Sequence, residues 1–255
     1  WGNATGPYHS SQNPSGKGDT VSDRVEFIRW QTVIHQPRDL ISNLRCCLDN
    51  IEWRVIYPDR ETPKPLDCGA AMVSDWLASA FVTTKLENFI EGVDTNSSFV
   101  NQTTGKALGE PGTGIITFGG RFVNPVVKYA EDGSTPQADR APVKFHEEGG
   151  MFHFQYANGT NIPGAELPQS VINHDEDMFV IETYTDMEGR LNVICYGFGW
   201  QGTYAAGKFF ENTMYPHLGL YTDGWVIVHW EETNGDGFVN EPGSGDTYTV
   251  MARGS

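Results

Sequence analysis

The stretch "CYGFGWQGTYAAG", residues 195–207, joins an apolar run to a helical pattern through three glycines, and this order decides the fold class. The run at 191–195 has the composition of a buried strand. Gly197, Gly199 and Gly202 have the spacing G-x-G-x-x-G, with which dinucleotide-binding proteins hold a pyrophosphate at the start of a helix. A strand, a glycine turn and a helix in this order indicate an α/β fold.

Two features argue against a nucleotide at this turn. The acidic residues that could hold a ribose, Glu231 and Glu232, follow noticeably later than the spacing of about 20 residues found in such sites. Trp200 stands inside the turn, where its indole would crowd a pyrophosphate. We therefore expect no nucleotide cofactor. In the alternative interpretation the glycines permit positive φ and close helix–strand approach, and Thr203 caps the helix.

Outward from this turn, strands and helices alternate along the chain. The pattern predicts strands at 25–34, 52–57, 114–118, 225–232 and 247–252, hairpins at 143–156 and 178–196, and helices at 70–90, 125–131 and 203–214. Asn124 is the expected cap of the second helix and Pro125 its first residue. The sum is a mixed α/β sheet with packed helices and β-hairpin decorations.

The chain divides into two parts of different composition. Residues 1–24 are polar and rich in Gly and Ser, with Pro7 and Pro14 opposing a helix, so we expect an extended N-terminal arm. Residues 25–255 show no internal boundary and are expected to form a single globular domain.

The net charge of −16 excludes several classes of partner, because it would repel phosphate backbones and anionic lipid heads. No window reaches the roughly 18 apolar residues of a membrane-spanning helix. The sequence opens on Trp1 without Met or an apolar leader, from which we expect a processed terminus. Nucleic acid and a membrane span are therefore not expected.

Sequons and cysteines indicate an extracellular protein. Four N-x-[ST] sequons lie in polar stretches and are expected to be glycosylated, at Asn3, Asn96, Asn101 and Asn158. The even set of cysteines has no C-x-x-C spacing, and the neighbours Cys46 and Cys47 are expected to pair each with either Cys68 or Cys195. Four buried free thiols are the alternative.

Two segments carry a resemblance to a known family. "GIITFGGRFVNPVVKYAED" and "LNVICYGFGWQGTYAAGKFF" resemble segments of archaeal S-layer-type surface proteins, over about residues 114–131 and 190–252. The resemblance implies an exported, non-catalytic α/β scaffold of a thermophilic archaeon, built from copies of itself into a cell-surface layer or an extracellular filament.

A second motif predicts a calcium site in the loop "EETNGDGFVNEPGSGD". Counting from Glu232, oxygen-bearing groups fall at positions 1, 3, 5, 7 and 9 of an EF-type loop, with a glycine at 6, and Asp246 reaches in from outside. The expected ligands are Glu232, Asn234, Asp236, the Phe238 carbonyl, Asn240 and Asp246. The alternative is a hairpin turn. Residues 94–101 partly repeat this EF-type pattern, and there we expect a glycan instead of a metal ion.

The acidic run His174, Asp175, Glu176 and Asp177 is a candidate second cation site, or a solvated turn.

Three functions remain from the sequence as a whole. The first is a self-assembling extracellular structural protein, in which the arm exchanges a strand with a neighbouring copy. The alternatives are a secreted glycan-binding module, to which the many aromatic residues could contribute a face, and a hydrolase using Asp175 and Asp177.

Overall fold

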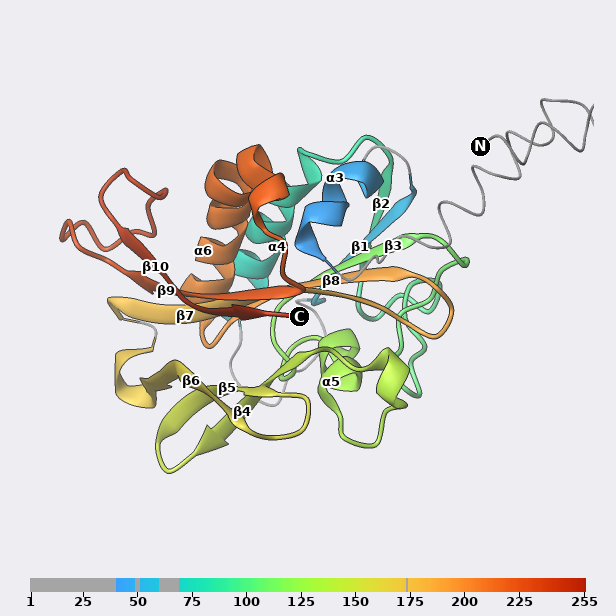
Figure 1. Cartoon of the computed structure of the whole chain (residues 1–255), viewed down its shortest axis with the longest axis horizontal. Helices are drawn as coiled ribbons and strands as arrows, with labels where there is room; N and C mark the ends of the chain where they lie inside the picture. Colours follow the sequence, from blue (N-terminus) through green and yellow to red (C-terminus); the bar gives the residue numbers. More distant parts are fainter. Residues whose placement is uncertain (1–39, 49–50, 60–68, 173) are drawn as a thin grey trace, which may run out of the picture. The chain divides into compact units, whose positions relative to one another are not determined.

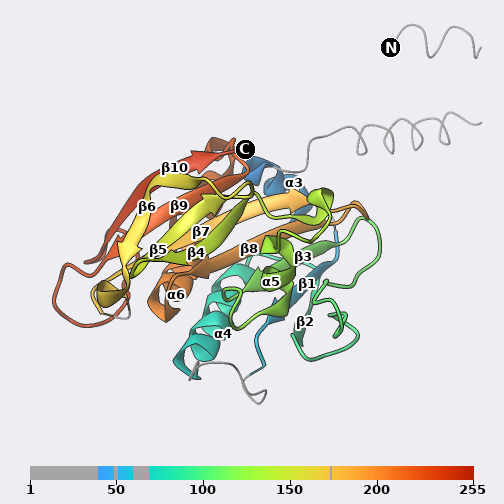
Figure 2. The same cartoon turned by 90° about the horizontal axis from the view of Figure 1, so that it is seen from below.

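A computed structural model describes residues 40–48, 51–59, 69–172 and 174–255. They form three layers, with a seven-stranded mixed sheet in the middle (Figures 1 and 2). Helices α3 (Leu44–Cys47), α4 (Gly69–Thr83) and α6 (Trp200–Phe209) cover one face, while α5 (Pro125–Glu131) and a three-stranded sheet cover the other. The expected mixed α/β class is confirmed. The predicted arm at 1–24 and the predicted strand at 25–34 lie outside the described residues.

The large sheet has a parallel half and an antiparallel half, in the order β10-β9-β7-β8-β3-β1-β2. Its strands are β1 (Trp53–Tyr57), β2 (Phe89–Val93), β3 (Gly114–Phe118), β7 (Glu176–Thr185), β8 (Leu191–Gly197), β9 (Trp225–Glu231) and β10 (Thr247–Gly254). Strands β2, β1, β3 and β8 are parallel, whereas β7 is antiparallel to β8 and β9, and β10 is antiparallel to β9. The first residues of β7 therefore lie beside the last residues of β8.

The small sheet, in the order β4-β5-β6, contains β4 (Val143–Glu148), β5 (Met151–Tyr156) and β6 (Asn161–Pro168). The hairpin predicted at 143–156 is confirmed, with Gly149 and Gly150 both at positive φ in the two-residue turn. The hairpin of β7 and β8 is also confirmed. Strand β6 was not predicted, because Pro163 and Gly164 interrupt its pattern.

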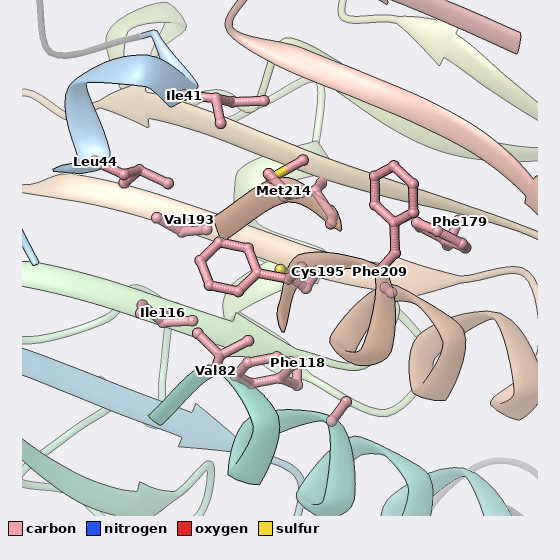
Figure 3. Close-up of a cluster of buried hydrophobic side chains, with 14 of the residues drawn as sticks. Ile41, Leu44, Val82, Ile116, Phe118, Phe179, Val193, Cys195, Phe209 and Met214 are labelled. Carbon is pink, nitrogen blue, oxygen red and sulfur yellow. The ribbon is translucent and has the colours of Figure 1, made fainter. Parts of the chain in front are cut away.

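Both faces of the central strands are buried, so their sequences read as nearly continuous apolar runs. Phe179 and Ile181 of β7 face the helices, whereas Met178 and Val180 face the small sheet and α5. Figure 3 shows the helix-side core, in which side chains from α3, α4, α6 and the sheet meet. Burying each such side chain contributes about 1.5–3 kcal/mol.

Two predicted helices have different bounds in the structure. The first was expected over 70–90, but α4 ends at Thr83, and residues 89–93 form β2 instead. The hydroxyls of Thr83 and Thr84 donate back to the carbonyls of Ala80 and Phe81, and the register of β2 with β1 takes Phe89 and Ile90 into the sheet. Tertiary pairing thus overrides the helical period.

The helix expected over 203–214 begins at Trp200, and its last part, Phe210–Met214, is a π-helical turn followed by a 3-10 stretch over Tyr215–Leu220. The cap predicted for α5 is confirmed, since Asn124 Oδ1 accepts the backbone N–H of Val126 at 2.9 Å. In the part of the chain that is described, no helix is both long and apolar enough to cross a bilayer.

Candidate functional site

The glycine turn after β8 is filled by a carboxylate from the neighbouring strand. Asp177, the second residue of β7, accepts the backbone N–H of Gly202 at 2.7 Å and that of Gly199 at 3.0 Å. It also accepts the N–H of Met178, next to it in the chain, at 2.7 Å. This cradle of N–H groups at a helix start is the arrangement that binds phosphate in nucleotide proteins, and here an internal anion occupies it.

Two glycines of the motif, Gly197 and Gly202, are needed for close contact and not for positive φ. None of Gly197, Gly199 and Gly202 is among the described glycines with positive φ, which corrects the expectation for these positions. A Cβ on Gly202 would lie 2.7 Å from the carboxyl carbon of Asp177, and one on Gly197 would meet the backbone of Gly202. Thr203 does not cap the helix, because its hydroxyl accepts the N–H of Gly197 at 3.0 Å and fastens the helix to the strand.

Burial sets the chemistry of Asp177. Its side chain is fully buried, and desolvation raises the pKa of the carboxyl to about 7, against the opposing effect of the N–H donors. A second aspartate lies at the same end of the parallel strands, where β3 leads into the turn at Gly119. A Cβ on Gly119 would overlap the carboxylate of Asp75 in α4. The glycine turns after β8 and β3 thus each face an internal carboxylate.

An apolar groove lies between the N-terminal halves of α4 and α6. It has a volume of about 320 Å³ and is lined by Val73, Ser74, Leu77, Trp200 and Tyr204. The two helices approach closely deeper in the layer, where a Cβ on Gly207 would lie 2.8 Å from the Cα of Ala78. The groove therefore opens where the helices begin.

The acidic run at 174–177 is not brought together as a cation site. Asp177 turns into the glycine cradle, whereas Glu176 Oε2 lies 3.1 Å from His229 Nε2. His174 and Asp175 are exposed. Because consecutive strand residues point to opposite faces, the carboxylates of Glu176 and Asp177 face different surroundings, so the candidate cation site does not form from this run.

The loop from Glu232 to Asp246 folds its side-chain oxygens back onto its own backbone. Glu232 Oε1 accepts the N–H groups of Asn234 at 3.0 Å, Gly235 at 2.5 Å and Asp236 at 3.2 Å. Asn234 Oδ1 accepts the N–H of Asp236 at 2.9 Å, and Asp236 Oδ1 accepts that of Phe238 at 2.8 Å. Side-chain oxygens at positions 1, 3 and 5 of the predicted frame therefore all accept backbone N–H groups of the loop itself.

The end of the loop closes on the same region through Asp246. Its Oδ2 accepts the N–H of Asn240 at 2.6 Å and the indole N–H of Trp230 at 2.8 Å. The residue is 7 % exposed, and its Oδ1 is buried without a hydrogen-bond partner among the described residues. In the described ranges, no group of three or more His, Cys, Asp or Glu side chains forms a metal-binding cluster. The predicted ligand set is mixed and includes amide and carbonyl oxygens.

Three of the four sequons can be located, and all three have the same geometry. Asn96, Asn101 and Asn158 are exposed. In each, the side-chain oxygen accepts the backbone N–H of the Ser or Thr two residues ahead, at 2.9–3.0 Å. This turn fixes the oxygen and leaves the side-chain nitrogen toward solvent. Asn3 lies outside the described residues.

Cys195 corrects the expected disulfide framework. It carries a free thiol that is 1 % exposed, in the middle of the helix-side core (Figure 3), and burial raises the pKa of this thiol well above its usual range. As the fifth residue of a central strand it faces other core side chains. Cys68 and the side chain of Cys46 lie outside the described residues, and a bridge from Cys46 or Cys47 to Cys68 stays a prediction.

A buried acidic pair was missed in the sequence. Glu131 is the last residue of α5, and its Oε1 accepts a hydrogen bond from the Tyr196 hydroxyl. Its Oε2 lies 3.8 Å from Nη1 of Arg121. Glu182 of β7 accepts the N–H of Val143 at 2.9 Å. Desolvation raises the pKa of Glu131 to about 7 and that of Glu182 well above its usual value. An acidic residue inside the apolar run "MFVIETY" is the signal that could have found Glu182.

The two edges of the large sheet differ. Strand β2 pairs with β1 alone among the described residues, in unbroken register, and exposes Phe89 and Ile90 by 38 % and 41 %. At the other edge, β10 has a bulge at Met251, a device that discourages further pairing.

No family model matches the chain, and no curated protein matches it.

Proposed function

We propose that this chain is a structural subunit of an extracellular assembly: secreted, glycosylated, non-catalytic and bound to copies of itself. In this proposal the N-terminal arm of one copy adds a strand to the sheet of the next. Such a heterologous contact repeats from head to tail, so it produces a filament or a layer. The archaeal surface proteins that two of its segments resemble have the same role.

The observation that carries the proposal is the edge of β2, which has no second pairing strand among the described residues. An unpaired edge with exposed apolar side chains is a template for strand addition. Natural edges are usually protected by a bulge, a lysine or a proline, but β2 has the sequence "FIEGV" and a regular register. Its only charge is Glu91. This edge therefore suits a pairing strand from another chain.

The distribution of charge favours the arm as the connector. Residues 1–24 contain two basic residues, Lys17 and Arg24, and two acidic residues, Asp19 and Asp23. Of the 17 basic and 33 acidic residues, 15 and 31 remain, so the whole net charge of −16 belongs to residues 25–255. Two such bodies repel each other. A neutral arm can approach the acidic body of a neighbour without that cost.

The buried state of the carboxylates supports a non-catalytic role. Asp177 is fully buried and Asp175 is exposed, so the two do not face one substrate space. Glu131 and Glu182 are also buried in the interior. The exposed sequon geometry supports export, because glycans need solvent.

The experiment compares assembly of four proteins by light scattering and electron microscopy. The full chain should form multimers, and deletion of residues 1–20 should leave a folded monomer. Ile90→Lys should also give monomers, since a lysine on the edge opposes pairing. Leu220→Lys is the matched control, because Leu220 is 70 % exposed and lies outside the edge strands. If the truncated chain or Ile90→Lys still forms the native multimer, the proposal is wrong.

One observation favours the alternative of a glycan-binding module. The groove between α4 and α6 presents Trp200 and Tyr204, and Trp76 on the same helix as Val73 is 51 % exposed. Aromatic faces of this kind can hold the apolar face of a sugar ring. A glycan array with the monomeric truncated chain tests it, and Trp200→Ala should abolish any hit.

A further inference from the structure

We propose that the loop at 232–246 binds one calcium ion through side-chain and backbone oxygens, with Asp246 as the buried ligand that closes the site. This inference is independent of the proposed assembly, because it concerns the connection between β9 and β10 within one copy.

The side chains at positions 3, 5 and 9 of the loop meet at one point. Asp236 Oδ2 lies 3.2 Å from the amide nitrogen of Asn234 and 2.9 Å from that of Asn240. The carbonyl of Phe238 lies 3.4 Å from the same Asn240 nitrogen. Each amide carries an oxygen that replaces its nitrogen after a half-turn of the terminal group. Three side chains and a carbonyl can thereby present oxygen to a cation at the position of the two amide groups.

The buried carboxylate of Asp246 gives an independent reason for a ligand. Its Oδ2 accepts the N–H of Asn240 in the loop and the indole N–H of Trp230 in β9, which fixes the carboxylate between the two, while Oδ1 is buried without a hydrogen-bond partner among the described residues. Such an oxygen is costly, because a buried acceptor without a partner loses its hydration. A cation bound between Asp246 and Asp236 would satisfy it.

Backbone and charge fit the same ion. Gly235 and Gly237 have φ of 75° and 73°, the left-handed turns that bring alternate residues to one side. Five acidic residues and no lysine or arginine occur between Glu231 and Ala252. Hard oxygen ligands that include carboxylates are typical of calcium sites.

The ion is tested with the full chain, first freed of metal by a chelator. Tb³⁺ replaces Ca²⁺ at oxygen sites, and its luminescence is excited by a nearby indole, which Trp230 provides. We expect saturable Tb³⁺ luminescence at one ion per chain, displaced by Ca²⁺. A signal that does not saturate, or that Ca²⁺ does not displace, would overturn the inference.

Three variants separate a built site from general attraction to acidic surface. Asp236→Asn should weaken calcium binding at least tenfold. Glu241→Gln removes the same charge from the same loop, where Glu241 lies 4.0 Å from Lys208, and should change the affinity less than twofold. Asn234→Asp adds a carboxylate at position 3 and should tighten binding several-fold. Equal losses in the first two variants, or weaker binding in the third, would contradict the site, and circular dichroism in chelator confirms that each variant is folded.

Discussion

Asp177 accepts a hydrogen bond of 2.7 Å from the backbone N–H of Gly202, and this contact fixes the start of α6 to the first residues of β7. The contact depends on topology, since only an antiparallel β7 brings its second residue to the carboxyl end of β8. The glycine motif and the acidic run, separate in the sequence, are thus two halves of one structural feature.

We expect Asp177→Ala to lower the free energy of unfolding by about 3 kcal/mol, because it leaves the buried N–H groups of Gly199 and Gly202 without an acceptor. Urea unfolding at pH 6 measures the loss. Asp175→Ala is the control, an exposed aspartate two residues away, and should change stability by less than about 0.5 kcal/mol. Equal effects of the two substitutions would show that the cradle contributes nothing.

We also expect no binding of NAD, FAD or ATP at the glycine turn. A phosphate would have to displace the carboxylate of Asp177, which already holds the N–H groups of Gly199 and Gly202. A ligand at 100 times its dissociation constant would stabilise the chain by about 2.7 kcal/mol. Thermal unfolding with each nucleotide at millimolar concentration should therefore show no saturable rise in the melting temperature, and a clear rise would contradict this prediction.

Local signals predicted those parts of the fold that local chemistry decides. The cap at Asn124, the glycine turn at 149–150 and the buried strand at 114–118 follow from one residue type or one short pattern, and all are confirmed. The helix predicted over 70–90 was wrong in its last part, because the apolar spacing of residues 86–90 fits a helix. Pairing of residues 89–93 with β1 makes a strand there instead.

The glycine turn could be placed but not interpreted, because its occupant comes from another strand. G-x-G-x-x-G has the same local geometry whether a ligand or a side chain accepts its N–H groups. Nothing near Gly197 in the sequence identifies Asp177, 20 residues earlier, as the acceptor. For the same reason Cys195 was expected to pair, since its position in the core depends on the layers on both sides of β8.

Native material should carry a glycan on each of Asn96, Asn101 and Asn158. The turn made by each asparagine exposes the nitrogen that is modified. Peptide mapping by mass spectrometry should find these three sites occupied, and also Asn3, while Asn161, exposed but outside a sequon, stays bare. Asn158→Gln should lower the intact mass by one glycan. Unmodified peptides at the sequons in native material would contradict the prediction.

The chain should be more stable in mild acid than at neutral pH. Glu131 and Asp177 both have folded-state pKa values of about 7, above the ordinary values of 4.5 and 3.8, and that of Glu182 is raised further. A carboxyl whose pKa is raised on folding stabilises the protein fully below its unfolded pKa and loses that contribution as pH rises through its folded pKa.

The expected window is therefore from about pH 4 to above pH 7, with a loss of stability on the order of 3 kcal/mol for Glu131 and for Asp177. Below this window stability should fall again as the pH is lowered. Asp139 and Asp132 have lowered pKa values, and they lose their hydrogen bonds when they are protonated. Urea unfolding at pH 5 and pH 7.5 should show the difference. Glu131→Gln keeps the shape of the side chain without its charge, so it should reduce the difference, whereas Glu148→Gln, at an exposed carboxylate, should not. Equal stability at the two pH values would show that these buried groups remain neutral or find partners throughout.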